Sequence, residues 1–368
     1  MKKSAKNTIM MYVGCFTMKE RGGNGDGGIG VFKKEPNGSF ERVQTVPQFN
    51  PSYLAMSEDK KFLYGVQGKG HEIYSYAIDE ETGRLSFINS IKSGAGLACE
   101  VCNGYLYVVA GTVQIFQLNE DGSIGDQIAS FSPKGEVGPI TGVQHAAQPH
   151  HILHDIQKHF FAVPCRGMDS VHVYFHDIHE NKVDEVSVLH TYGGSYPRHI
   201  AFHPTKPVAY QLLERYGMVL MCHYGNGVLT PVEMLPTVPP EFVGLFNAAG
   251  EIAVHPNGEL LAISNRGANN IAMFHILEDG RLQLIGWTKE HVSIPRFFTF
   301  DDEGGRLYCA NIGQCPPDRP ITKEGDAIPG TGDITVYDVN SKTGELTFTG
   351  ERIPIPAPSC ILFKTLTY

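Results

Sequence analysis

Short apolar segments alternate with polar turns along the whole chain, and they follow one repeated plan. Each unit reads as an apolar strand, a turn, a second strand, a polar turn, a third strand ending in an aromatic residue, and a glycine turn before a fourth strand. Six starts can be read: Pro51, Leu97, Pro149, Pro197, Ala249 and Pro295. Their spacing of roughly 46–52 residues, outside the insertions, is the length of a four-stranded β-propeller blade.

A seventh unit is split between the two ends of the chain. Its start at Pro358 is followed by one strand only, whereas TIMMYVGCF, GGIGVFKKE and SFERVQTV near the N-terminus supply a second, third and fourth strand. We expect the last strand to lie beside the first three and close a ring, since closure removes exposed sheet edges. The predicted fold is all-β, a seven-bladed β-propeller of four-stranded antiparallel blades that forms a single domain over residues 1–368, with minimal helix.

The hairpin turns within the blades support this plan. Glycine follows acidic or polar residues in the turns around 80–85, 120–122, 278–280 and 342–344, where it can adopt positive φ. The segment 314–331, QCPPDRPITKEGDAIPGT, is rich in proline and glycine and predicts a surface loop at one end of the central channel.

Composition narrows the class of protein and its partners. Hydrophobic residues make up 42% of the chain and charged residues 19%, which is typical of a globular protein. The net charge of −9 argues against a nucleic-acid surface, although a local arginine cluster can still bind a small anion. The sequence contains no apolar run long enough to span a membrane, and its N-terminal apolar run is too short for a signal peptide. We expect a cytoplasmic chain without nucleic-acid or membrane partners; an oligomer of identical chains is compatible with the sequence.

The cysteines and several histidines are expected to be structural. Several of the eight cysteines lie in apolar strands and are predicted to be reduced, buried thiols. Cys99 and Cys102 have C-x-x-C spacing, but no second pair matches them at zinc-site spacing, so we expect no metal and no cofactor. His203 and His255 precede prolines and are interpreted as turn residues.

Charged residues stand where the predicted blades meet the channel. The first strand of a propeller blade lines the channel, so residues at the strand starts should converge near its axis. The starts carry His150, Arg198, His199, Glu251 and Arg296. Loops after the second strands add Arg166, Glu214 and Arg266. We expect these side chains to gather at one end of the channel.

Several of these stretches together resemble a known family. They are PRHIAFHP at 197–204, NRG at 265–267, the Pro-His pair at 149–150 and AYQLLE ending at Glu214. From Tyr12 to Phe363 the chain is similar to the seven-bladed β-propeller lactonases, which include 6-phosphogluconolactonases and fungal carboxy-cis,cis-muconate lactonizing enzymes. The resemblance implies a catalytic site of His150, Arg198, Glu214 and Arg266.

Two positions depart from the family pattern. Cys165-Arg166-Gly167 stands where an Asp-Leu-Gly-like turn is usual, and Leu213 stands where Asn often precedes the Glu. Both changes lie at the rim of the expected site, so they leave the identity of the substrate open.

Opening a lactone requires an activated water and stabilisation of an oxyanion. His150 is the expected general base, and Arg198 can polarise the carbonyl or bind a carboxylate. Glu214 can orient these two groups or carry the proton, while Arg266 and Arg296 can hold an anionic tail. Further substrate contacts are expected from Glu251, His199 and Arg166. The structural alternatives are an ion pair between Arg198 and Glu214 and a bridge between blades for Arg296.

The leading function is hydrolysis of a sugar lactone, 6-phosphogluconolactone to 6-phosphogluconate, with a small anionic lactone as the substrate. One alternative is a cycloisomerase that acts on a carboxymuconate with the same residues. Others are a non-catalytic propeller that serves as a binding platform and a metal-dependent sugar lactonase. For the last of these we expect that a chelator would cause no loss of activity.

Overall fold

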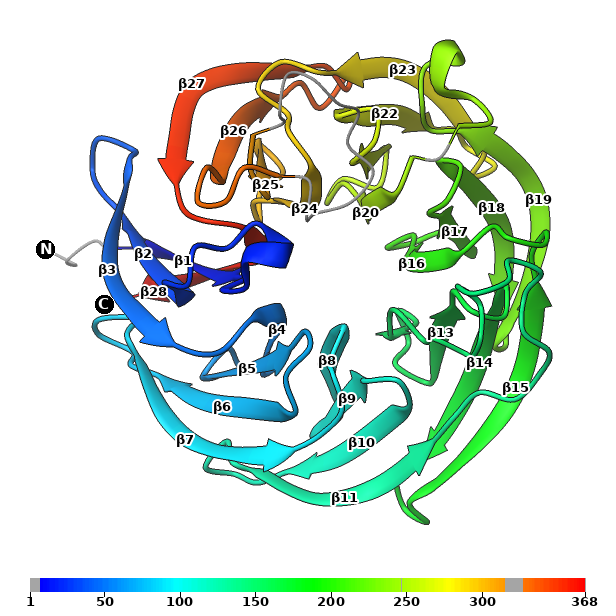
Figure 1. Ribbon diagram of the computed structural model, residues 1–368, viewed down its shortest axis with the longest axis horizontal. Helices are drawn as coiled ribbons and strands as arrows, with labels where there is room; N and C mark the ends of the chain where they lie inside the picture. The colour runs from blue at the N-terminus through cyan, green and yellow to red at the C-terminus, as the bar shows by residue number, and fades with distance from the viewer. Residues whose placement is uncertain (1–6, 246, 315–326, 368) are drawn as a thin grey trace, which may run out of the picture.

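The computed structural model describes residues 7–245, 247–314 and 327–367. Within these residues, 28 strands form seven four-stranded antiparallel sheets around a central axis (Figure 1). The prediction of a seven-bladed β-propeller is confirmed. Helical structure in the described part consists of two three-residue 3₁₀ turns, η1 (Lys19–Arg21) and η2 (Pro240–Phe242), and no described helix could cross a membrane.

We number the blades along the chain and give the strands of each from the axis outward. Blade 1 contains β4 (Pro51–Met56), β5 (Phe62–Gln67), β6 (Glu72–Ile78) and β7 (Leu85–Lys92). Blade 2 contains β8 (Ala98–Cys102), β9 (Tyr105–Val109), β10 (Val113–Leu118) and β11 (Ile124–Phe131). Blade 3 contains β12 (Leu153–His154), β13 (Phe160–Cys165), β14 (Ser170–Asp177) and β15 (Lys182–His190). Blade 4 contains β16 (Pro197–Phe202), β17 (Val208–Leu213), β18 (Met218–Gly225) and β19 (Val228–Pro236).

The remaining blades complete the ring. Blade 5 contains β20 (Ala249–Val254), β21 (Leu260–Asn265), β22 (Asn270–Ile276) and β23 (Leu282–Thr288). Blade 6 contains β24 (Pro295–Phe300), β25 (Arg306–Asn311), β26 (Asp333–Val339) and β27 (Leu346–Pro354). Blade 7 contains β28 (Pro358–Thr367), β1 (Asn7–Cys15), β2 (Gly28–Lys34) and β3 (Phe40–Pro47).

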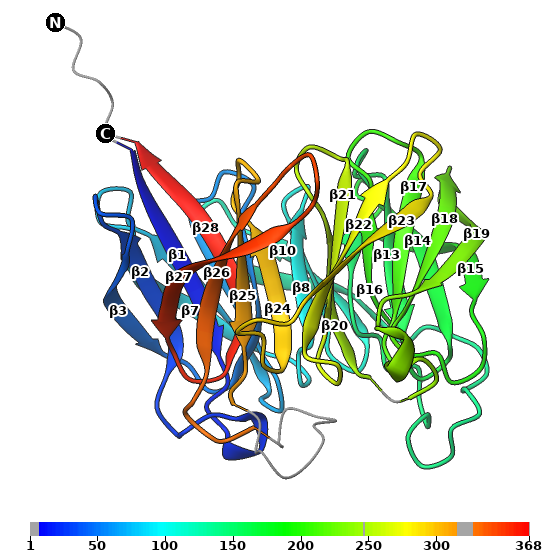
Figure 2. The same ribbon diagram turned by 90° about the horizontal axis from the view of Figure 1, so that it is seen from above.

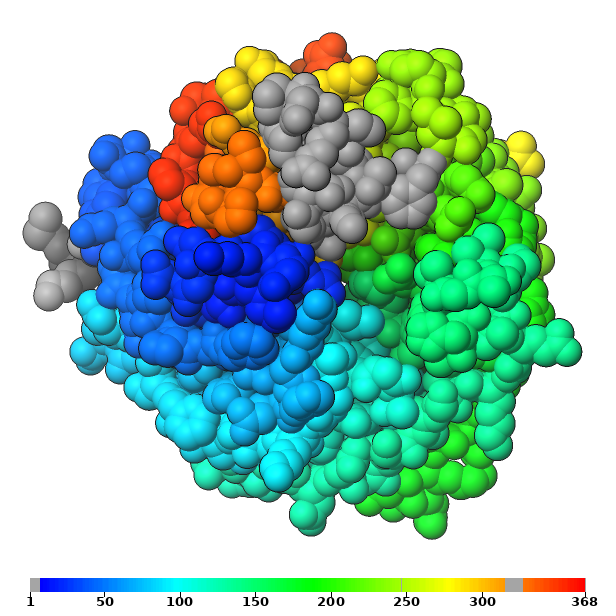
Figure 3. Space-filling model, in the orientation of Figure 1, coloured from blue at the N-terminus to red at the C-terminus, as the bar shows by residue number. Residues whose placement is uncertain are grey.

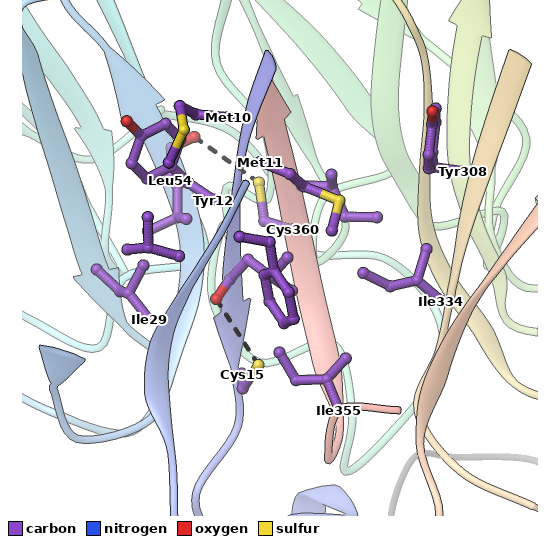
Figure 4. Close-up of a cluster of buried hydrophobic side chains, with 14 of the residues drawn as sticks. Met10, Met11, Tyr12, Cys15, Ile29, Leu54, Tyr308, Ile334, Ile355 and Cys360 are labelled. Atoms are coloured by element: carbon purple, nitrogen blue, oxygen red, sulfur yellow. Dashed lines mark hydrogen bonds between the residues drawn. The ribbon is translucent and has the colours of Figure 1, made fainter. Parts of the chain in front are cut away.

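Blade 7 closes the ring with strands from both ends of the chain, as predicted. β28 pairs antiparallel with β1 from Asn7–Thr367 onward, and the sheet order is β28-β1-β2-β3. Side chains of β1 and β28 pack on Leu54 of blade 1 on one side and on Tyr308 and Ile334 of blade 6 on the other (Figure 4). The closing strand therefore completes a sheet and also joins two inter-blade cores.

The hydrophobic core is divided into layers between neighbouring blades. Separate buried clusters lie between blades 1 and 2, 2 and 3, 3 and 4, 4 and 5, and 5 and 6. Second strands such as β9 and β13 read as continuous apolar or small residues because they are covered on both faces. Seven of the cysteines belong to the described part, and all seven are buried free thiols.

A tyrosine–glycine contact links several blades. Tyr210 of β17 donates its hydroxyl hydrogen to the carbonyl oxygen of Gly280, in the outer turn of blade 5, at 2.8 Å. Tyr12 and Tyr64 make the same contact with turn glycines of the following blades, Gly83 and Gly122. The turn glycines have positive φ, as the sequence predicted.

We predict that Tyr210→Phe destabilises the protein by about 1–2 kcal/mol, because a buried carbonyl loses its partner. Urea unfolding followed by circular dichroism would measure the change. Tyr74→Phe is the control: the Tyr74 hydroxyl bonds Glu72 at a partly exposed position, so its loss should cost less than about 0.5 kcal/mol. Equal effects of the two substitutions would contradict the prediction.

The chain enters most inner strands through a residue in the left-handed region. The residue just before the inner strand start has φ of 44–59° in six blades, at Asn50, Gln148, Tyr196, Ala248, Ile294 and Ala357. Non-glycine residues pay roughly 1–2 kcal/mol for this conformation. All except Gln148 are fully buried, and packing holds them there. This bend repeatedly turns the chain from a loop into the channel wall.

The inner strand starts and the loops between second and third strands lie on one face of the ring, which we call the entrance face. Figure 2 shows this face along its lower edge, where η1, η2 and the loop of residues 132–148 project. In the space-filling view of the same face, the segment around η1 and the 132–148 loop stand out from the ring (Figure 3). Most of the predicted 314–331 loop falls on residues 315–326, outside the described residues; its ends meet where Thr331 accepts a hydrogen bond from the Gln314 amide at 2.7 Å.

Candidate functional site

A layer of polar side chains occupies the second position of the inner strand starts. It contains Ser52, His150, Arg198, Arg296 and Ser359, each one residue after a blade start, whereas Gly250 occupies this position in blade 5. His150, Arg198 and Arg296 are each at least 95% buried. Because the inner strands surround one axis, consecutive blades bring these groups to the same end of the channel.

Glu214 is the centre of the site and is surrounded by arginines from three blades. Its Oε2 lies 3.0 Å from Arg166 Nε of blade 3 and 3.4 Å from Arg198 Nη1 of its own blade. Its Oε1 accepts a hydrogen bond from Arg266 Nη2 of blade 5 at 2.8 Å. One carboxylate therefore partly neutralises three guanidinium groups, and Arg296 adds a further positive charge nearby. The cluster carries a net positive charge, which suits an anionic ligand.

Arg198 and Arg266 are fixed by backbone carbonyls as well as by Glu214. Arg198 Nε donates to the oxygen of Gly250 at 2.7 Å, and Arg266 Nε donates to the oxygen of Ala248 at 2.7 Å. Charge-assisted hydrogen bonds of this kind set the direction of the planar fork. The side chains are thus held in place before any ligand arrives.

Glycines beside these arginines let neighbouring backbone segments approach closely. A Cβ on Gly250 would lie 2.6 Å from the oxygen of Pro295, and one on Gly267 would lie 2.6 Å from the oxygen of Asn247. Only glycine fits such contacts. Gly267 follows Arg266, and its amide donates to Asn247 at 2.6 Å, which ties the Asn-Arg-Gly turn to the loop before β20. Arg166-Gly167 repeats this arrangement in blade 3.

His150 contacts Arg198 directly. Arg198 Nη1 lies 2.8 Å from His150 Nε2. A guanidinium nitrogen can only donate, so Nε2 is the acceptor and the proton of the neutral ring is on Nδ1. Nδ1 is buried and has no hydrogen-bond partner among the residues that the structure describes. The N–H at this position is therefore an unpaired buried donor within the cluster.

Burial and the neighbouring positive charges control protonation here. Desolvation, followed by the charge of Arg198, lowers the pKa of His150 well below its usual value. Desolvation likewise lowers the pKa of His151 and of His199. Burial and the nearby Arg266 lower the pKa of Arg198, while Glu214 acts in the opposite sense. Desolvation raises the pKa of Glu251 to about 7.

We predict that the protein loses about 2 kcal/mol of stability between pH 6.5 and 5.5. The unfolded chain protonates its histidines in this window, whereas burial beside Arg198 keeps His150, His151 and His199 neutral in the folded state. Stability present above pH 6.5 is therefore lost as the pH falls. Glu251 offsets the stability lost through about one of the three histidines. Its raised pKa makes the folded state bind a proton in this window that the unfolded chain does not bind. Urea titrations at pH 7.5, 6.5 and 5.5 would measure the loss; a constant or increasing stability would contradict it.

A second layer lies one residue further along the inner strands. Its members are Tyr53, His151, His199, Glu251 and Phe297. His199 Nδ1 lies 2.8 Å from Glu251 Oε1, and the His199 ring stacks on His151 with centroids 4.4 Å apart. The Tyr53 ring contacts His151, His199 and Phe297 edge-on, at 6.2, 6.3 and 5.9 Å. Rings from four blades thus meet across the channel.

The structure brings the four residues implied by the resemblance into one cluster, together with Arg166. Arg296 lies close enough for its charge to act on His150 and Arg198, and its guanidinium lies 4.8 Å from the centre of the Phe16 ring. Glu251 and His199 lie in the second layer and bind each other. The roles expected for all eight residues stay predictions.

Sequence reasoning missed Phe16 and Tyr53 and did not assign His151 to the site. Tyr53 and His151 could have been found by comparing third positions of the aligned blade starts, since these positions face the same part of the channel. His203 and His255 are turn residues, as predicted: each ring accepts backbone amide hydrogens within its turn and contacts a carbonyl of the next blade.

Similar proteins agree with this architecture. The 6-phosphogluconolactonase of Bacillus subtilis is 26% identical over 371 residues, covering 96% of this chain and 97% of its own. An uncharacterised protein of Staphylococcus epidermidis is 28% identical, covering 95% of this chain and 98% of its own. The solved periplasmic gluconolactonase of Pseudomonas aeruginosa superposes with a TM-score of 0.85 at 22% identity, covering 98% of this chain and 99% of its own. At that identity the superposition shows the fold alone.

A family model described as "Lactonase, 7-bladed beta-propeller" matches residues 10–314. The match extends over most of the chain and includes every residue of the Glu214 cluster, from His150 to Arg266. The resemblance inferred from the sequence is confirmed, and the chain belongs to the seven-bladed β-propeller lactonase family.

Proposed function

We propose that this protein hydrolyses 6-phosphogluconolactone to 6-phosphogluconate at the Glu214 cluster. The observation that carries the proposal is the net positive charge of the channel mouth. The carboxylate of Glu214 neutralises only part of the charge of the four arginines there, Arg166, Arg198, Arg266 and Arg296. An anionic phosphate group on the lactone would complement this charge. The similarity to the Bacillus subtilis 6-phosphogluconolactonase supports the same choice.

In the proposed reaction, Arg198 acts on the carbonyl and His150 acts on water. Arg198 binds the carbonyl oxygen and stabilises the negative charge that forms as water attacks. When Nη1 turns toward the substrate, the Nε2 lone pair of His150 is released and accepts the proton of the attacking water. The ring C–O bond then breaks, and the departing oxygen takes that proton from His150. One lactone and one water give one hydroxy acid.

Glu214 and Arg266 have positioning roles in this scheme. Glu214 keeps Arg198 in the channel mouth, and Arg266 holds Glu214 through Oε1. Arg166 suits the rim, because about a quarter of its side chain is exposed. Arg166 and Arg296 would bind the phosphate, replacing part of its hydration by charge-assisted hydrogen bonds.

The test is to incubate the purified protein with 6-phosphogluconolactone, with gluconolactone and with a carboxymuconate. We expect kcat/KM, measured from the release of acid, to be at least tenfold higher for the phosphorylated lactone than for the uncharged gluconolactone. If the protein turns over only the carboxymuconate, the proposed hydrolysis is wrong and the cycloisomerase reaction becomes the assignment. Absence of turnover with all three compounds would contradict an enzymatic role at these substrates.

A further inference from the structure

Below the Glu214 cluster, the channel contains a cavity with a volume of about 340 Å³. Its wall comes from blades 1, 3, 4, 5 and 6, and Pro204 and Pro256, from the turns after β16 and β20, lie at its outer end. We call this cavity the lower channel pocket. The later residues of the inner strands line this pocket, whereas the Glu214 cluster lies at the starts of these strands.

The wall of the lower channel pocket is mostly apolar. Aliphatic and aromatic side chains form most of the wall, including Ile200, Phe202, Ile252, Val254, Phe297 and Tyr53. His151, Glu251 and the hydroxyl of Tyr53 supply polar groups from the second layer, and the wall also contains Thr299, whose hydroxyl donates to the Phe300 oxygen at 3.1 Å. Pockets of this size with few polar groups are typical small-molecule sites.

Glu251 lines this pocket and has one carboxylate oxygen without a hydrogen-bond partner among the described residues. Its Oε1 contacts His199 Nδ1 at 2.8 Å and accepts a hydrogen bond from the Ile252 amide at 3.0 Å. Its Oε2 is buried and has no hydrogen-bond partner among the described residues. A buried oxygen without a hydrogen-bond partner costs free energy. A ligand that hydrogen-bonds to it removes this cost in addition to forming the bond.

The surroundings of Glu251 restrict the chemistry of that ligand. The charges of Arg198 and Arg296 reach Glu251 and disfavour a further cation. A second carboxylate would be repelled by Glu251 in its ionised form. A hydroxyl group can both donate and accept, so it pairs with Oε2 whether or not the carboxyl is protonated.

We infer that the lower channel pocket binds a small uncharged molecule with an aromatic or aliphatic body and one hydroxyl group, which hydrogen-bonds Glu251 Oε2. The body lies against Phe297 and the apolar wall, and the hydroxyl points toward the second layer. This pocket lies beyond the Glu214 cluster, and its occupation does not depend on the reaction proposed there.

The experiment uses fluorine NMR titrations of the full chain with 4-fluorophenol and with 4-fluorotoluene, which lacks the hydroxyl. We expect a Kd of about 1 mM or tighter for the phenol, a typical value for a ligand of this size, and binding at least tenfold weaker for the toluene. Ala253→Phe, which fills the pocket, should weaken phenol binding at least tenfold. Ala77→Phe, the same change on β6 of blade 1, should alter it less than twofold.

Two outcomes would overturn the inference: equal binding of the two compounds, or phenol binding that Ala253→Phe leaves unchanged. Crystals of the parent protein soaked with 4-bromophenol provide a measurement that needs no variant. An anomalous bromine peak within the lower channel pocket, with the hydroxyl at hydrogen-bond distance from Glu251, is expected. Bromine elsewhere, or none in the channel, would refute the site.

Discussion

Replacing Arg198 with leucine is expected to lower kcat/KM for 6-phosphogluconolactone about 10³-fold, the scale at which a preorganised oxyanion donor contributes. Arg198 contacts His150, Glu214 and the backbone oxygen of Gly250 in blade 5. Its loss removes the group proposed to bind the carbonyl oxygen and the partner of the proposed base, His150. Leucine keeps an apolar stem of similar length, and Glu214 retains Arg166 and Arg266.

The rate is measured by oxidising the 6-phosphogluconate formed with an excess of a coupling dehydrogenase, after subtraction of spontaneous hydrolysis. Arg281→Leu is the matched control, since Arg281 is an exposed turn residue paired with Asp279, and its rate should stay within twofold. Proton NMR provides a second readout: without the charge of Arg198, the pKa of His150 should rise. An Arg198→Leu protein that is folded and hydrolyses the lactone at the parent rate would refute the assignment.

The blade plan could be predicted from the sequence because each blade repeats the same local signals. The proline starts, the aromatic ends of third strands and the turn glycines all recur at blade length, and six of the expected starts head the inner segments. Leu97 differs by one residue, since β8 begins at Ala98. In blade 3 the start at Pro149 is an isolated bridge to Cys165, and regular pairing of β12 begins only at Leu153.

The chemistry of the site could be predicted only as a set of residues. A repeat aligns strand starts, so it places His150, Arg198 and Arg296 at one end of the channel. It does not say which neighbour each side chain contacts, because that depends on rotamers and on the offset between blades. The Arg198–His150 contact, which determines the tautomer of the ring, is such a detail. For the same reason, the sequence did not predict that Glu251 and His199 lie in a second layer, separate from the Glu214 cluster.

The second large effect is expected from Glu214→Gln, which removes a negative charge with little change of shape. Arg198 and Arg266 are almost fully buried, and Glu214 is the carboxylate that they share. Removing one partner of a buried ion pair leaves uncompensated charge and costs about 3–5 kcal/mol. We expect a loss of this size in the free energy of unfolding, measured with urea at pH 7.5. Glu241→Gln, at an exposed pair with Lys289, should change it by less than about 0.5 kcal/mol.

Glu214→Gln also tests the net charge of the channel mouth. With Glu214 neutral, the arginines gain affinity for small anions, and an anion that binds only the folded state stabilises it by mass action. Inorganic phosphate should therefore recover more stability in Glu214→Gln than it adds to the parent protein or to Glu241→Gln. A stability unaffected by the substitution, or a phosphate effect equal in all three proteins, would contradict the view that Glu214 neutralises a cluster of buried cations. A large loss with selective recovery would mean that the arginines, rather than the carboxylate, define what this end of the channel binds.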